Sequence, residues 1–295
     1  MGHTVRMLDN LALGRGQLDR LAHRRSDSAW FADVCAAPDT FVVGVCAGNV
    51  IAEAGALSNL RRLPVDPAQA ALLGEAGGRV YIALMLDDPG LLEGSTSLRE
   101  LGASLSDNEA AVATAAVALH QWHRTHTNCA RCGAATVSAL AGWERHCTAD
   151  GSAHYPRTDP AVIVLITDDD DRLLLARQHV WPERRFSLVA GYVEPGETAE
   201  HAVEREVLEE VGLDVRDIEF LGSQPWPFPA SLMLCYRALA THTDFVVDGV
   251  EIAEAQWLSR SDLAQNVADG SLLLPSAVSV ARRAIEYWFG SDLTD

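Results

Sequence analysis

The sequence predicts an α/β fold with two domains and a small module between them. The chain has 295 residues, of which 48% are hydrophobic, enough for two cores at roughly 150 residues per domain. Short apolar runs typical of strands alternate with segments of helical periodicity. Residues 127–157 differ, because they are poor in large aliphatic side chains and rich in Cys, His, Gly and Thr. We therefore expect an N-terminal α/β domain over 1–126, a metal-stapled module over 127–157 and a C-terminal domain over 158–295.

The first 126 residues contain local signals for both strands and helices. Residues 41–46 and 79–86 are β-rich apolar runs bounded by Gly, Pro and Asp, which predicts two strands. The pattern of residues 67–74 predicts a short helix. Residues 106–109 have the sequence Ser-Asp-Asn-Glu, a capping box, so the alanine-rich run to His123 predicts a long helix.

The last 138 residues alternate strand and helix signals in a way that indicates an α/β sandwich. Glycine follows the first predicted helix at Gly212, where it can end the helix in a left-handed conformation. The expected strands are 161–167, 172–177, 186–192, 218–222 and 232–240, and the expected helices are 198–211 and 276–289.

Charge excludes several chemistries. All 23 basic residues are arginine, and 41 acidic residues give a net charge of −18. Without lysine the chain has no amine for Schiff-base or pyridoxal phosphate chemistry, and no P-loop lysine. Residues 161–295 contain 24 of the acids and 10 of the arginines. A chain this acidic is a poor non-specific binder of nucleic acid.

Composition also indicates the compartment. The longest apolar runs are too short to span a bilayer, and the N-terminus lacks the apolar region of a signal peptide. Six cysteines in a chain of this length do not indicate a disulfide scaffold. We therefore expect a cytoplasmic protein that does not enter membranes.

The most informative segment is a carboxylate-rich helix. Glu206, Glu209 and Glu210 are spaced i, i+3 and i+4, so they share one helix face. The simple alternative is a solvated acidic face. Hard divalent cations such as Mg²⁺ or Mn²⁺ would turn the repulsion into binding. From Gly191, five residues lead to Glu197, and after seven more comes Arg-Glu-Val-Leu-Glu-Glu-Val-Gly-Leu at 205–213.

This spacing resembles the Nudix box at every specified position. The resemblance implies an α/β/α sandwich with a mixed sheet for the C-terminal domain. It also implies that Glu206 and Glu210, with Glu209 nearby, bind divalent metals and activate water.

A proline- and aromatic-rich segment follows the box. Residues 223–231 have the sequence Ser-Gln-Pro-Trp-Pro-Phe-Pro-Ala-Ser. Three prolines should stop both helix and central strand, which predicts a rigid loop that holds Trp226 and Phe228. A structural surface loop is the alternative. The segment is similar to the signature of NADH pyrophosphatases of the NudC type, whose order of N-terminal domain, zinc ribbon and Nudix domain also agrees.

That resemblance implies hydrolysis of NAD(H) to nicotinamide mononucleotide and AMP, removal of NAD caps from RNA 5′ ends, and a homodimer. Implied metal ligands are the Ala190 carbonyl, Glu206, Glu210 and Glu251. For Glu251 a surface acid is the alternative, and for Arg99 a solvated surface arginine. The implied substrate-binding residues are Tyr155, Tyr192, Gln224, Pro225, Trp226, Pro227, Phe228, Pro229, Ala230, Ser231, Ala281 and Arg99.

Three cysteines have the spacing of a zinc ribbon. Cys129 and Cys132 form a C-x2-C pair that can share a tetrahedral metal with Cys147. The resembled family has a fourth Cys where this chain has Asp150. Asp150, His146 or His154 could complete the site, or the module could fold without metal.

Two other functions remain open at this point. One is a broader dinucleotide or ADP-ribose hydrolase. The other is a zinc-ribbon nucleic-acid module with an inactive Nudix domain, which the charge balance of three arginines and three acids over 127–160 disfavours. RNA decapping would depend on local arginine pairs such as 61–62, 184–185 or 282–283.

Overall fold

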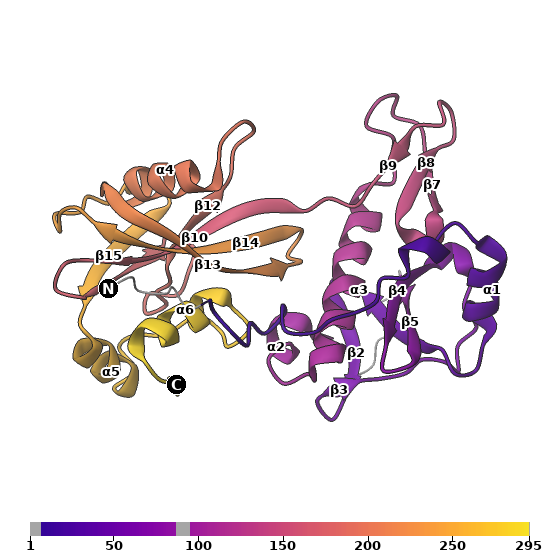
Figure 1. Ribbon diagram of the computed structural model, residues 1–295, viewed down its shortest axis with the longest axis horizontal. Helices are drawn as coiled ribbons and strands as arrows, with labels where there is room; N and C mark the ends of the chain where they lie inside the picture. The colour runs from indigo at the N-terminus through magenta and orange to yellow at the C-terminus, as the bar shows by residue number, and fades with distance from the viewer. Residues whose placement is uncertain (1–6, 87–94, 295) are drawn as a thin grey trace. The chain divides into compact units, whose positions relative to one another are not determined.

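The computed structural model describes residues 7–86 and 95–294, which form two compact units. One unit contains the described residues 13–86 and 95–158 together with 225–231. The other contains the described residues 7–12 together with 159–224 and 232–294. Figure 1 labels many of the helices and strands of both units. Whether residues 127–157 are a domain apart from 1–126 stays a prediction.

The first unit is built on a six-stranded sheet covered by a long helix. Strand order is β3-β2-β1-β5-β4, with β6 paired to β2, and β1 runs parallel to β5. Helix α3 contacts β1, β4 and β5 with a face of buried alanines and valines. The elements are η1 Ala22–Arg24, α1 Ser28–Ala36, β1 Phe41–Cys46, β2 Asn49–Glu53, β3 Ala56–Leu57, η2 Pro67–Gln69, β4 Ala70–Ala76, β5 Arg79–Met85, β6 Ser95–Ser97, α2 Leu98–Leu101 and α3 Asp107–Thr125.

The predicted strands and the long helix of this unit are confirmed, but one prediction is wrong. The capping box is present, and Glu109 also accepts a hydrogen bond from Leu57 N at 2.9 Å. Residues 67–74, expected as a helix, form only the turn η2 before the chain enters β4. Pairing of the apolar β4 with β5 overrides the weak local helix preference.

The cysteine-rich segment is a three-stranded antiparallel sheet, β7 Thr136–Ala139, β8 Glu144–Cys147 and β9 Ala153–His154. The turn η4 Leu140–Gly142 packs against the N-terminal sheet. A Cβ at Gly142 would lie 2.4 Å from the Cβ of Ala71, so only glycine fits there. The indole of Trp143 donates to Leu72 O at 2.6 Å. The small sheet is therefore fixed to the larger one.

The second unit is a sheet with helices on both faces, as the sequence predicted. Its sheet has the order β13-β14-β10-β11-β15, with β12 antiparallel to β10. The elements are β10 Asp159–Thr167, β11 Leu173–Gln178, β12 Val189–Tyr192, α4 Ala199–Val211, β13 Val215–Trp226, β14 Ser231–Ala240, β15 Ile252–Leu258, α5 Arg260–Ala268 and α6 Val280–Phe289.

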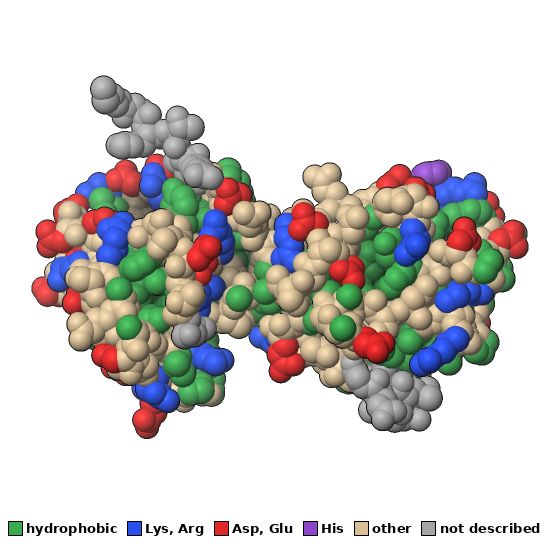
Figure 2. Space-filling view, turned by 90° about the horizontal axis from the view of Figure 1, so that it is seen from below, with side chains coloured by type: hydrophobic (Ala, Val, Ile, Leu, Met, Phe, Trp, Pro, Cys, Tyr) green, Lys and Arg blue, Asp and Glu red, His purple; other side chains and the backbone are tan. Residues whose placement is uncertain are grey.

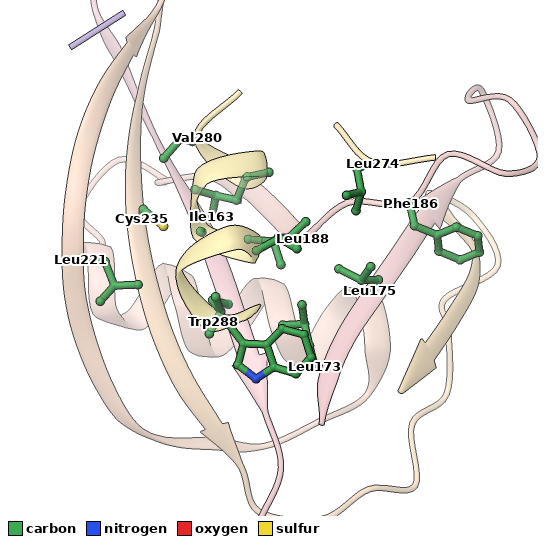
Figure 3. Packing of buried hydrophobic residues seen from close by; sticks show 14 of the residues in the cluster. Ile163, Leu173, Leu175, Phe186, Leu188, Leu221, Cys235, Leu274, Val280 and Trp288 are labelled. Atoms are coloured by element: carbon green, nitrogen blue, oxygen red, sulfur yellow. The ribbon is translucent and has the colours of Figure 1, made fainter. Parts of the chain in front are cut away.

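Alternation along the central strands builds the two cores. Ile163 and Leu165 of β10 face the core under α5 and α6, which Figure 3 shows around Trp288. Val162 and Val164 face the opposite core, where α4 packs its buried side chains. Burial on both faces explains why β10 is a continuous apolar run.

Several elements in this unit differ from expectation, including α6, which begins at Val280 rather than at residue 276. The strand expected over 186–192 is regular only over β12, and neither β15 nor α5 was predicted. Strand β13 continues through Pro225 to Trp226, so the expectation that the prolines end the strand there is wrong. Because β13 lies at the sheet edge, a proline without an N–H removes no ladder bond that a central strand would need.

His123 of α3 is held neutral at the junction of the two sheets in the first unit. Arg145 Nη1 donates to Nδ1 at 2.8 Å, so Nε2–H donates to Gly142 O at 2.8 Å. Burial lowers the pKa of His123 to about 4, with the Arg145 charge adding to the shift. Protonation would break the bond from Arg145.

We expect this histidine to make the first unit acid-sensitive. Because its folded pKa is depressed, its contribution is present above pH 6.5 and is lost as pH falls towards 4. The full loss is on the order of 3 kcal/mol. Unfolding midpoints between pH 7.5 and 4 should fall less steeply for His123→Gln than for the wild type. Equal slopes, or the same effect from the exposed control His201→Gln, would contradict this assignment.

Candidate active site

The carboxylates of α4 occupy one face of the helix, and the opposite face is in the core. Thr198 caps the helix through His201 N, and Gly212 ends it at φ 66°. Ala202, Val203, Val207 and Val211 pack on the sheet. This packing fixes the helix rotation, which leaves Glu209 exposed, Glu206 half-buried and Glu210 buried.

Glu210 is a buried carboxylate among other carboxylates. Its side chain is 4% exposed, and its Oε1 has no hydrogen-bond partner among the described residues. Burial, together with the negative charges of Glu206, Glu251, Asp248 and Glu209, raises its pKa to about 8. An orphaned acidic oxygen surrounded by negative charge fits a site for a hard divalent cation.

Arg205 organises the carboxylates around this point. It donates to Glu197 Oε1 at 2.8 Å, Glu206 Oε1 at 2.8 Å and Glu209 Oε2 at 3.1 Å, and to the Tyr192 carbonyl at 2.9 Å. The bond from Arg205 lowers the pKa of Glu197 to about 2. One guanidinium therefore orients the acids while leaving Glu210 uncompensated.

Gly191 lets β12 approach the helix closely. A Cβ at Gly191 would lie 1.9 Å from the Glu206 carboxyl carbon, so no larger residue fits without moving Glu206. Ala190, the preceding residue, pairs with Ile163 of the central strand. The pairing holds the Ala190 peptide on the strand that faces the glutamates.

Glu251 belongs to this cluster, although it lies beyond the helix. Its charge raises the pKa of both Glu206 and Glu210. Asp248 holds it there, because Oδ2 accepts from Glu251 N at 2.9 Å and Oδ1 from Ile252 N at 2.8 Å. Asp248 N in turn donates to the Glu210 carbonyl at 3.1 Å.

Both ends of the expected substrate segment are buried. Gln224 is fully buried and donates to Val278 O at 2.9 Å, and Ser231 is buried at the start of β14. Trp226 and Phe228 pack edge to face with centroids 4.9 Å apart. The Arg99 guanidinium lies 4.9 Å from the Trp226 centroid and 4.1 Å from that of Phe228.

The other expected substrate residues lie in different settings. Tyr155 and Tyr192 are 63% and 55% exposed, so their rings are available to a ligand. Ala281 is buried in the first turn of α6, and its N–H donates to Ser279 Oγ at 3.2 Å. The remaining residues of the segment, Pro225, Pro227, Pro229 and Ala230, lie between β13 and β14 or at the end of β13.

The structure brings together Cys129, Cys132, Cys147 and Asp150, whose ligand atoms all lie within 4.8 Å of one another. Ser152 holds Oδ1 of Asp150 through its N–H and hydroxyl, and this bonding lowers the pKa of Asp150. Oδ2 is left facing Cys129 at 3.9 Å.

The two alternative histidines differ. The imidazole of His146 contacts the Glu144 carboxylate. Nε2 of His154 lies 3.3 Å from the Cys129 sulfur, close enough to compete with Asp150.

Sequence comparisons identify both parts of this arrangement. Residues 157–275 match the NUDIX domain model, and residues 124–155 match the NADH pyrophosphatase zinc ribbon domain model. The NAD-capped RNA hydrolase NudC of Mycobacterium bovis is 44% identical over 237 residues, covering 75% of this chain and 76% of that protein. The chain belongs to the NudC-type Nudix hydrolases.

More distant relatives of this Nudix hydrolase match shorter stretches. The human NAD-capped RNA hydrolase NUDT12 is 36% identical over 196 residues, covering 62% of this chain and 42% of that protein. A crystal structure of a NUDIX hydrolase from Nitrosomonas europaea has a TM-score of 0.45 at 21% identity, covering 57% of this chain and 96% of that one.

Sequence reasoning missed Asp248 in this Nudix hydrolase. Its signal is the Asp-Gly-Val-Glu order of residues 248–251, since an aspartate can bond the backbone a few residues on and fix a turn. The motif of the family ends at Leu213, so nothing in the box points to this residue.

We expect Asp248→Asn to weaken metal binding while leaving maximal turnover largely unchanged. Losing one of the two accepted bonds frees Glu251 from the cluster. The Mg²⁺ concentration for half-maximal activity should rise about 10-fold, with kcat largely restored at saturating metal. Asp269→Asn is the matched control, because Asp269 bonds Ser271 N in the same way and is not among the charges that shift the pKa of Glu206 or Glu210. An unchanged metal requirement in Asp248→Asn would refute its role.

We expect the cysteine cluster to retain zinc through Asp150. Metal analysis of purified protein should show one zinc per chain, a content that falls in Asp150→Ala and is kept in His154→Ala. The opposite pattern would make His154 the fourth ligand. No zinc in the wild type would remove the site altogether.

Proposed function

We propose that this Nudix hydrolase cleaves the pyrophosphate bond of NAD(H) to nicotinamide mononucleotide and AMP, and removes NAD caps from RNA 5′ ends. The observation that carries the proposal is the buried, uncompensated Glu210 in a cluster with Glu206 and Glu251. The relatives named NAD-capped RNA hydrolases support the choice of substrate.

Glu206, Glu210, Glu251 and the Ala190 carbonyl would hold Mg²⁺ or Mn²⁺. Their oxygens are the hard donors that these cations prefer, and the orphaned Glu210 oxygen fits such a ligand. A bound divalent cation neutralises phosphate oxygens and lowers the pKa of water.

The protein's own contribution is orientation and proton transfer. Glu206, Glu209 and Glu210 are the proposed catalytic residues. Arg205 fixes the first two, and the exposed Glu209 side chain is accessible to water. The burial that raises the pKa of Glu210 also keeps bulk water from its carboxylate.

Aromatic side chains would bind the flat rings of the substrate. Tyr192 and the segment from Gln224 to Ser231 would line the pocket, with Ala281 contacting substrate through its backbone. Arg99, stacked on Trp226 and Phe228, would place positive charge beside these rings. We further propose a homodimer in which Tyr155 of one copy serves the site of the other.

The cysteine cluster would bind zinc as a structural metal with Cys129, Cys132, Cys147 and Asp150 as ligands. A cytoplasmic location fits six cysteines that form no disulfide. Among the described residues, no helix combines the length and apolarity needed to cross a bilayer.

We expect the protein with Mg²⁺ or Mn²⁺ to convert NADH to reduced nicotinamide mononucleotide and AMP. Glu210→Gln should lower kcat/KM at least 100-fold with the fold intact, because the central metal-facing carboxylate is gone. Circular dichroism and chromatographic product analysis check both parts. Rates on NADH, NAD, ADP-ribose and NAD-capped RNA should favour the nicotinamide substrates. No turnover of NADH with either metal, or full activity in Glu210→Gln, would overturn the proposal.

A further inference from the structure

The RNA strand of a capped substrate continues beyond the cap. Because the C-terminal unit is acidic, it needs exposed arginine side chains to bind the phosphates of that strand. Figure 2 shows arginines and carboxylates interspersed on the visible face rather than one continuous basic surface. Three arginine pairs are therefore the candidates, and the side chains of two pairs are largely used by the fold. Arg61 donates to two carbonyls at the end of α1. Arg282 is 5% exposed and bonds Glu286, and Arg283 forms ion pairs with two aspartates.

The third pair lies in an exposed loop, residues 178–185. Arg184 and Arg185 are both exposed, and no described carboxylate forms an ion pair with either. Arg184 Nη1 donates to the Gly270 carbonyl at 2.7 Å, which holds its stem in place and leaves other N–H groups for a ligand. Trp181 in the same loop is partly exposed. Guanidinium groups interleaved with an aromatic ring are typical of single-stranded nucleic-acid sites.

This loop begins beside the carboxylate cluster. His179 N donates to the Glu251 carbonyl at 3.2 Å, and its imidazole Nε2 lies 3.3 Å from the Gly249 carbonyl. The other end is anchored by Leu273 N bonding Arg184 O at 2.7 Å and by the buried Phe186, visible in Figure 3. Arg184 is five positions after His179, which corresponds to at most about 17 Å of extended chain. The first phosphates after the cleaved bond can therefore reach the loop.

We propose that the loop 178–185 binds the RNA strand that follows the cap, with Arg184 and Arg185 on phosphates and Trp181 on a base. The inference rests on the proposed function and deepens it. Free NADH has no phosphates beyond its pyrophosphate, so the loop acts on capped RNA alone. Its arginines supply local positive charge within residues 161–295, where 24 acids outnumber 10 arginines.

The test is Arg184→Gln with Arg185→Gln in one full-length protein, assayed on NADH and on an NAD-capped RNA of about 20 nucleotides. Glutamine at 184 keeps an amide that can bond Gly270. We expect kcat/KM on capped RNA to fall about 10-fold, and its dependence on log salt to flatten by about 1.4, with NADH unchanged. The control is Arg216→Gln with Arg237→Gln, which changes net charge equally but removes arginines paired to carboxylates. Trp181→Ala should also lower activity on capped RNA alone.

Three outcomes would overturn the inference. The first is equal loss on NADH and capped RNA, which would mean that the loop supports the fold or the catalytic site. The second is unchanged decapping in the double variant, and the third is the same loss in the control. If the wild-type protein does not hydrolyse NADH, the proposed function itself is wrong. That result can be told apart from a failure of the loop inference, in which the wild type is active.

Discussion

The site is built around the buried carboxylate of Glu210, whose Oε1 has no hydrogen-bond partner among the described residues. Its position is forced by packing, because Val207 and Val211 on the same helix are fully buried in the core under β10. Because those valines are packed in the core, the Glu210 side chain is also buried, and the other carboxylates of the cluster lie around it. Desolvation and like charges act in the same direction, which is why its pKa rises to about 8. A bound cation is the simplest way to stabilise this arrangement.

Several neighbouring residues hold the other carboxylates in position around Glu210. Arg205 compensates the outer acids and so determines which carboxylate is left for a ligand. Gly191 provides the space that the Glu206 carboxylate fills. Asp248 connects Glu251 to the carbonyl of Glu210 through a short turn. Helix α4, strand β12 and the turn at 248–251 thus all contribute to the surroundings of the Glu210 carboxylate.

The sequence was most predictive where structure depends on local spacing. The face of Glu206, Glu209 and Glu210 and the end of α4 at Gly212 follow from helical periodicity and one left-handed glycine. The helix predicted over residues 67–74 was wrong because β4 forms by pairing with β5, an interaction that the local sequence does not reveal. Asp248 was missed for a similar reason, because its role depends on hydrogen bonds to two backbone N–H groups that no sequence motif describes. Pro225 was misjudged because sheet order, which places β13 at an edge, cannot be read from local sequence.

The most direct measurement compares thermal unfolding of the wild type and Glu210→Gln at pH 8, without divalent metal and with Mg²⁺. Because the folded pKa of Glu210 is raised, its ionisation lowers stability as pH rises from 4.5 through 8. Without metal, Glu210→Gln should therefore unfold at a higher temperature than the wild type. Mg²⁺ should raise the midpoint of the wild type and leave the variant nearly unchanged. A metal-free variant that is less stable than the wild type, or an equal gain from Mg²⁺ in both proteins, would contradict the account.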